Sequence, residues 1–388
     1  MARRLRGIKG EGTVRRRSDG RYEARVWLND GRRVSLYGTT QREVTRQVRE
    51  LKAQDEVGKP IVRNQERLGT FLESWLENEI MRRRRAKTYS SYEQMVRCHM
   101  LREIGAVKLT ELSARRVQSW LDAKHDSGLS ARTVRYLRDI LRSALSHAWR
   151  NDLVAENVAK KVTVPELVKK QIVPMTPAQA MSLLGELRTN RLLAFYSVAI
   201  ALGLRPAEAI GLRWSDVDLT ERRLAVRQTI QRIRTDPDAQ RGHRSRLVVD
   251  ETKTDAGTRL IDLPESLVAR LRAHKALQVL ERRAAAEQWQ ELGLVFTTVY
   301  GTPLEERRVV KIFKEALAAA GLSRSVRLYD CRHTAASLLY AQGVPELQIA
   351  AILGHTDPAF TRRTYTHLFP EMRRAAADSI ESLVGKAL

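Results

Sequence analysis

The chain has 388 residues, and its 69 Lys and Arg exceed its 45 Asp and Glu by a formal net charge of +24 at pH 7. That length allows two or three domains, and that charge favours a polyanionic partner such as nucleic acid, although an anionic membrane surface also fits. The sequence has no apolar run long enough to span a bilayer and no signal-peptide pattern at its N-terminus, so we expect a cytoplasmic or nucleoid protein without a membrane partner. The only two cysteines, Cys98 and Cys331, lack CxxC spacing, and we expect neither a disulfide nor a zinc site.

Residues 1–64 are predicted to form a small N-terminal domain with a three-stranded sheet followed by a helix. Residues 21–28 and 32–37 alternate as strands do, on either side of a turn at residues 29–31. Eleven Lys or Arg face four acids among residues 1–33, interleaved with Tyr22 and Trp27. A β-ribbon of this kind fits the major groove of DNA, whereas the alternative is a merely solvated basic surface.

Residues 65–165 are predicted to form a helical bundle. Thr70, Thr88, Ser113 and Ser130 each have the sequence context of a helix N-cap. The last helix has one apolar stripe, formed by Val134, Leu137, Leu141, Leu145 and Ala148. Packing explains the stripe, and the arginines opposite it favour a side that faces DNA.

Residues 170–388 are predicted to form a mixed α/β domain, which makes the whole chain α+β and mainly α. The Thr176-Pro177 pair begins a helix, and strands are expected at residues 224–230, 246–249 and 259–263. A Gly-rich phosphate loop of the GxxxxGK type is absent from the sequence, so nothing indicates ATP.

Two arginines in this third domain are candidates for binding a phosphate. Gly203 is expected to end one helix and Pro206 to begin the next, which places Arg205 at a helix N-terminus where anions bind. Glu208 lies one turn further on and can orient a neighbouring cation. Arg332 follows Tyr329 by three residues and shares a helix face with it. Two guanidinium groups can hold both non-bridging oxygens of a phosphodiester, although Arg205 taken alone could as easily be a surface arginine.

Three further residues can supply proton transfer and a nucleophile. Lys253 lies between two strand-like segments, where a lysine is usually just solvated but can act as a general acid. Gly354 is expected to end a helix, with His355 directly after it, and Tyr365 follows ten residues later. A tyrosine can attack phosphorus once arginines offset the negative charge, although a lone His or Tyr is most often structural.

In order and spacing, the segments 203–208, 331–334, 353–355 and 364–367, together with Lys253, resemble the tyrosine recombinase, or phage integrase, family. The resemblance implies that Arg205 and Arg332 clamp the phosphate, Lys253 is the general acid, His355 donates to the phosphate and Tyr365 is the nucleophile, with Glu208 in support. Tyr329 stands where the family usually has His. A tyrosine hydroxyl can still bind phosphate, but it is a poorer base than histidine at neutral pH.

The resemblance also implies an activity and its partners. We expect a site-specific recombinase that forms a 3′-phosphotyrosyl intermediate without a metal or other cofactor. Residues 1–64 resemble an arm-binding domain, residues 65–165 a core-binding domain and residues 170–388 a catalytic domain. The expected partners are double-stranded DNA with core-type and arm-type sites, three further copies of the chain in a tetramer, and an accessory DNA-bending or excision factor. The alternatives are a type IB topoisomerase and a catalytically silent DNA-binding regulator.

Overall fold

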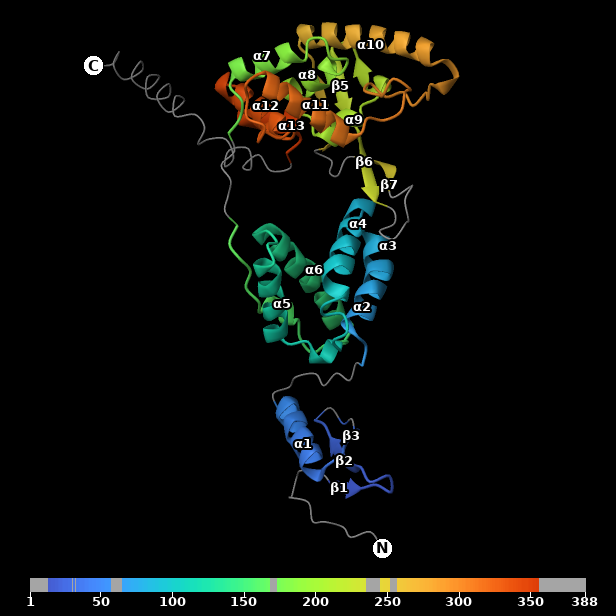
Figure 1. Ribbon diagram of the computed structural model, residues 1–388, viewed down its shortest axis with the longest axis vertical. Coiled ribbons are helices and arrows are strands. Elements are labelled where there is room, and N and C mark those ends of the chain that lie inside the picture. Colours follow the sequence, from blue (N-terminus) through green and yellow to red (C-terminus); the bar gives the residue numbers. More distant parts are fainter. Residues whose placement is uncertain are drawn as a thin grey trace, which may run out of the picture. The chain divides into compact units, whose positions relative to one another are not determined.

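The computed structural model describes residues 13–29, 31, 33–56, 65–167, 173–234, 245–251 and 257–355 (Figure 1). The chain divides into two compact units, Met1–Lys169 and Lys170–Leu388. Among the residues that the structure describes, no helix is both long and apolar enough to cross a membrane. The mainly helical α+β fold that the sequence predicts is confirmed.

The N-terminal sheet has three antiparallel strands in the order β1-β2-β3, followed by α1. Their bounds are β1 (Thr13–Arg16), β2 (Tyr22–Trp27), β3 (Arg33–Gly38) and α1 (Gln41–Glu56). Alternate residues of β2, Ala24 and Val26, pack with Val44 and Val48 of α1 in a small apolar cluster. Because side chains alternate across a strand, Arg25 and Trp27 lie on the opposite, exposed face.

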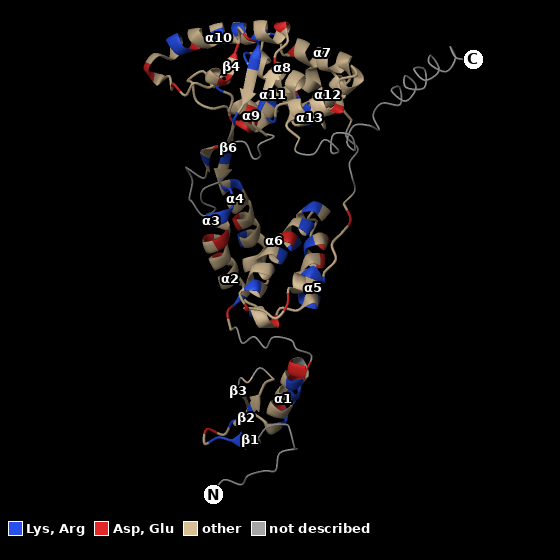
Figure 2. Cartoon of the chain, turned by 180° about the vertical axis from the view of Figure 1, so that it is seen from behind, with Lys and Arg blue, Asp and Glu red and all other residues tan. Residues whose placement is uncertain are grey.

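Among its described residues, the helical bundle contains seven helical segments before α6 and one after it. They are α2 (Leu68–Trp75), η1 (Leu76–Ile80), α3 (Met81–Arg83), α4 (Ala86–Met95), η2 (Val96–Leu101), η3 (Leu109–Glu111), α5 (Ala114–Asp126), α6 (Ala131–Arg150) and η4 (Val158–Lys160). The stripe predicted on α6 is fully buried. Lys and Arg are spread along β1 and along the helices of this bundle (Figure 2).

Two of the four predicted N-caps in this region are confirmed and two are wrong. Ser113 and Ser130 accept hydrogen bonds from the backbone amides of Arg116 and Thr133. Thr70 and Thr88 instead lie inside helices, which begin two residues earlier at Leu68 and Ala86. The first turn of a helix tolerates most residues, so a threonine there is no unique marker of the boundary.

The second unit combines helices with two small antiparallel sheets. Its helices are α7 (Pro177–Glu186), α8 (Leu193–Leu202), α9 (Pro206–Ile210), η5 (Trp214–Asp216), α10 (Glu265–Ala285), η7 (Ala286–Gln288), α11 (Glu306–Ala319), α12 (Asp330–Ala341) and α13 (Glu346–Leu353). One sheet has the order β4-β5-β8 and the other pairs β6 with β7, where the strands are β4 (Val217–Asp218), β5 (Arg223–Val226), β6 (Gln228–Arg234), β7 (Ser245–Glu251) and β8 (Arg259–Asp262). The predicted strand at residues 224–230 is therefore two strands in different sheets, β5 and β6.

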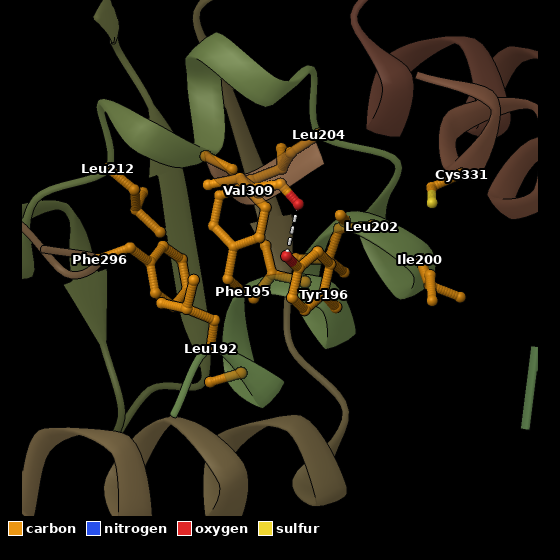
Figure 3. Packing of buried hydrophobic residues seen from close by; sticks show 14 of the residues in the cluster. Leu192, Phe195, Tyr196, Ile200, Leu202, Leu204, Leu212, Phe296, Val309 and Cys331 are labelled. Carbon is orange, nitrogen blue, oxygen red and sulfur yellow. Dashed lines mark hydrogen bonds between the residues drawn. The ribbon is translucent and has the colours of Figure 1, made fainter. Parts of the chain in front are cut away.

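Helix α8 forms the centre of this unit and is buried on nearly every side. The ring of Phe195 packs edge-on against Tyr196 and Phe296, with ring centroids 5.3 Å apart in each pair. The buried Tyr196 hydroxyl donates a 2.7 Å hydrogen bond to the carbonyl of Val309 on α11 (Figure 3). Since α8 also packs against α12, this core fixes the two chain segments that carry the predicted arginines.

Candidate active site

Gly203 ends α8 in the left-handed region, with a φ of 62°, as the sequence predicts. A Cβ atom at this position would lie 2.6 Å from Leu353 Cδ2 and 3.1 Å from Ala335 Cβ. Glycine therefore allows the end of α8 to approach both α12 and α13. The next residues leave this point of close packing and form the N-terminus of α9.

Arg205 and Glu208 hold each other at the start of α9. The Arg205 backbone amide donates to Glu208 Oε2 at 2.9 Å, and its Nη1 donates to Glu208 Oε1 at 2.5 Å. Burial lowers the pKa of Arg205, but the Glu208 carboxylate outweighs burial and raises it, with Tyr329 adding in the same direction. Arg205 thus stays charged, and its side chain remains 35% exposed and open to a ligand.

Glu208 is itself buried and shared with a second arginine, Arg259 of β8. Arg259 Nη2 donates to Glu208 Oε2 at 2.9 Å, and its Nη1 donates to Oε1 at 3.3 Å. Burial raises the pKa of Glu208, but Arg259 and then Arg205 outweigh it and leave the pKa lowered. The carboxylate is therefore ionised at neutral pH, as a carboxyl between two guanidinium groups should be.

Arg332 is almost completely buried on the first turn of α12. Its Nη1 donates to the Gly203 carbonyl at 3.0 Å, and its buried Nη2 has no hydrogen-bond partner among the described residues. Burial first, and then repulsion from Arg205, lowers the pKa of Arg332 to about 10. A buried unpaired donor of positive charge is costly, and an anion bound beside it would remove that cost.

Tyr329 is the N-cap residue of α12, so it precedes the helix that the sequence predicts it to share with Arg332. Its ring meets that of His333 edge-on at 5.6 Å between centroids, and it is 41% exposed. Tyr329 helps to raise the pKa of Arg205 and opposes the lowering of the pKa of Arg332, so it acts electrostatically on both arginines.

Helix α13 ends at Gly354, and His355 follows it next to Arg205. Gly354 is left-handed, and the amides of Gly354 and His355 bond to the carbonyls of Ala351 and Ala350, a Schellman ending. Arg205 Nη2 also donates to the Gly354 carbonyl at 3.4 Å. Burial first, and then Arg332 and Arg205, lowers the pKa of His355 to about 4, so this imidazole is neutral at pH 7.

The structure thus brings five predicted site residues together, and they are Arg205, Glu208, Tyr329, Arg332 and His355. Lys253 and Tyr365 lie outside the described residues.

Arg259 belongs to the same cluster and was missed by the sequence reasoning. Strand alternation puts Arg259 on the same face of β8 as Ile261, but only the fold shows that this face is the buried one, where a charge must be paired.

Comparison with known proteins shows to which family a chain with this site belongs. Residues 174–372 match the phage integrase family, and residues 67–125 match the N-terminal SAM-like domain of phage integrases. The chain belongs to the phage integrase family. It is a site-specific tyrosine recombinase, as the resemblance of its motifs predicts.

Several relatives extend over most of the chain. A protein named tyrosine recombinase XerC-like, from Caldanaerobacter subterraneus subsp. tengcongensis, is 26% identical over 361 residues, covering 90% of this chain and 92% of its own length. An integrase from Streptomyces ambofaciens is 29% identical over 331 residues, covering 84% and 83%. The fold is that of the Tn1549 transposon integrase in complex with a circular intermediate DNA, with a TM-score of 0.65, 19% identity and coverage of 81% and 99%. A lambda integrase dimer bound to a core site gives 0.57 with 16% identity and coverage of 95% and 97%.

Proposed function

We propose that this phage integrase family member cleaves one DNA strand through Tyr365. The phenolic oxygen of Tyr365 gives up its proton to solvent, attacks the phosphorus of a phosphodiester and forms a 3′-phosphotyrosyl bond. The bond from phosphorus to the 5′ oxygen breaks, and Lys253 donates the proton that this oxygen takes up. The freed 5′ hydroxyl of a partner strand then attacks the phosphotyrosine and releases Tyr365, so the bond energy is conserved.

The unpaired Nη2 of Arg332 is the observation that carries this proposal. It is a buried cationic donor beside Arg205, whose side chain is still partly exposed. Two guanidinium groups can each donate to a different non-bridging oxygen, and the charge that grows on those oxygens in the transition state strengthens both bonds. A phosphodiester held there satisfies the donor that no described residue of the chain pairs.

Tyr329 and His355 complete the donor set in this proposal. Neutral His355 can donate one hydrogen bond to the phosphate, and the Tyr329 hydroxyl can donate to the phosphate or to Tyr365. Because tyrosine is a weak base, we assign Tyr329 a binding role rather than removal of the Tyr365 proton. Tyr329→Phe is then expected to slow cleavage while the affinity for DNA stays nearly unchanged.

The test is covalent trapping on DNA. Sequencing the DNA that flanks the gene supplies candidate attachment junctions, and nicked duplexes built on them release the downstream strand after cleavage. The wild-type chain is expected to form a DNA adduct that survives denaturing electrophoresis, whereas Tyr365→Phe binds the same DNA and forms none. An adduct of normal yield with the Phe variant would overturn the assignment of the nucleophile.

The remaining parts of the chain are proposed to hold the DNA. We assign residues 1–64 to arm-type sites, residues 65–165 to core-type sites and residues 170–388 to catalysis, with four copies on two duplexes and an accessory DNA-bending or excision factor. The exposed face of the N-terminal sheet supports the first assignment. Trp27 is 66% exposed with Arg33 over its ring at 5.8 Å, and Arg17 lies 5.4 Å from the Tyr37 ring centre. Aromatic and cationic groups on one sheet face suit a DNA groove.

A further inference from the structure

Arg259 bonds to three separate segments of the chain at once. It donates to both oxygens of Glu208 on α9, through Nη1 and Nη2. Its Nε donates to the carbonyl of Ile352 in the last turn of α13 at 2.7 Å, and its Nη1 donates to the carbonyl of Gly257 at 3.1 Å. All three nitrogens are therefore engaged, and its side chain is only 6% exposed.

These bonds connect Arg205 with the end of α13, where His355 lies. Ile352 has one of the last carbonyls of α13, which lack partners inside the helix, and His355 follows it by three residues. Glu208 in turn holds the backbone amide and the guanidinium of Arg205. The path from Arg205 through Glu208 and Arg259 to α13 thus consists of short hydrogen bonds between charged or backbone groups.

We propose that Arg259 is a positioning residue, which fixes Arg205 and His355 at the spacing that one phosphate requires. This inference rests on the proposed function of the same site. Arg259 is not itself assigned to the phosphate, because its three nitrogens already donate inside the protein. A guanidinium is suited to this position because its fork reaches a carboxylate and two carbonyls together, whereas a lysine ammonium is a single point.

Two substitutions separate the charge of Arg259 from its shape. Arg259→Met removes both, and Arg259→Lys keeps the charge but loses the fork. Misplacing catalytic groups by about 1 Å costs up to roughly 100-fold in rate, so we expect both variants to slow single-turnover adduct formation on the nicked duplex by about 10- to 100-fold. The affinity for the DNA, measured by fluorescence anisotropy, should change less than about 3-fold, because the nitrogens of Arg259 donate inside the protein and add no phosphate contact of their own.

Arg191 provides a matched control in the same unit. It bonds through Nε and Nη2 to the two oxygens of Glu281 at 2.7 and 2.6 Å and through Nη1 to the Thr297 carbonyl at 2.8 Å. It precedes α8, whereas Gly203 and the site lie at the other end of that helix. Arg191→Met therefore removes a bidentate carboxylate pair and one carbonyl bond, one bond fewer than Arg259→Met removes. Its melting temperature should fall as in Arg259→Met, while its adduct formation stays within about 3-fold of wild type when assayed well below melting.

A neutral substrate distinguishes a positioning role from a general loss of structure. A methylphosphonate at the cleaved position replaces one charged oxygen by a methyl group, so its cleavage depends less on correctly placed cations. We expect the ratio of the wild-type rate to the Arg259→Met rate to be at least about 5-fold smaller on this substrate than on the phosphodiester. A ratio that is equal on both substrates, or Arg259 variants with wild-type rates, would overturn the inference.

The same assay keeps the two proposals apart. If wild type forms an adduct and Tyr365→Phe does not, the proposed function stands whatever Arg259 does. If wild type forms no adduct on junction DNA that it binds, the proposed function is wrong and the role of Arg259 is wrong with it. Wild-type activity in Arg259→Lys, with loss only in Arg259→Met, would show that the charge is sufficient. It would contradict the requirement for a guanidinium that bonds to a carboxylate and two carbonyls together.

Discussion

Glu23 in the N-terminal sheet and Glu208 in the second unit are both 2% exposed, and each carboxylate bonds to two arginines. Arg25 and then Arg15 lower the pKa of Glu23. Burial raises the pKa of Glu208, but Arg259 and Arg205 outweigh burial and lower it. They differ in their partners. The side chains of Arg15 and Arg25 are 57% and 43% exposed, whereas those of Arg205 and Arg259 are 35% and 6% exposed.

The difference shows how one pair of residue types serves two purposes. Around Glu23 the arginines cover the carboxylate while they stay in water, where salt and mobility weaken the pairing, so they can adapt to a DNA surface. Around Glu208 one arginine is locked inside the protein and the other is presented at fixed geometry. We infer that the sheet is built for adjustable affinity and the second site for precise placement of one phosphate.

Removal of each carboxylate should give the largest contrast. Glu208→Gln leaves buried cations uncompensated, which costs about 3 to 5 kcal/mol, whereas Glu23→Gln should cost about 1 kcal/mol or less. At saturating DNA, adduct formation should fall at least about 100-fold for Glu208→Gln and stay near wild type for Glu23→Gln. Calorimetric melting and single-turnover trapping measure both effects. Equal losses of stability in the two variants would contradict the comparison.

Two left-handed glycines test the same contrast in packing. Gly203 has a φ of 62° and tight neighbours, whereas Gly20 has a φ of 83° and nothing within 4 Å of an added Cβ. Gly20→Ala should cost only the backbone strain of about 1 to 2 kcal/mol. Gly203→Ala adds displacement of Leu353 and Ala335, so we expect about 2 to 4 kcal/mol and slower cleavage. Gly203→Ala with the stability and rate of Gly20→Ala would mean that the close approach of α8 to α13 is not required.

Local patterns in the sequence predict much of this site. Gly203 and Gly354 indicate the ends of two helices, and Pro206 indicates the start of another. The turns that carry Arg205 and His355 are therefore predictable. The role of Arg259 is not, because the run Arg259-Leu260-Ile261-Asp262 places apolar residues on both faces of β8. Only tertiary packing decides that Leu260 is exposed and Arg259 buried, and only the fold brings Glu208, 51 residues earlier, to its guanidinium.

The salt dependence of DNA affinity should next show whether the exposed arginines around Glu23 contact DNA. Each exposed arginine that meets a DNA phosphate adds about one released counterion, so Arg15→Gln and Arg25→Gln should each reduce the slope of log affinity against log salt by about 1. Fluorescence anisotropy with duplex DNA between low and physiological salt measures the slope. Arg191→Met serves as the control for loss of an arginine that bonds inside the protein, and its slope should match wild type. An unchanged slope in both sheet variants would remove the sheet face from DNA contact.

The smallest expected effect comes from acid and concerns His355 in the second unit, for which the N-terminal sheet has no counterpart because the first 64 residues contain no histidine. His355 has a pKa of about 4 in the fold against an ordinary 6.5, so between these values the unfolded chain binds more protons. Its contribution to stability is therefore complete above pH 6.5 and is lost as the pH falls to 4. The wild-type minus His355→Gln difference in melting temperature should rise with pH across this interval, by about 2 to 4 °C for each kcal/mol recovered. Burial and the cations of Arg332 and Arg205 together lower this pKa. A difference in melting temperature that does not change with pH would mean that the imidazole is neither buried nor close to the two arginines. His355 would then not belong to the phosphate site.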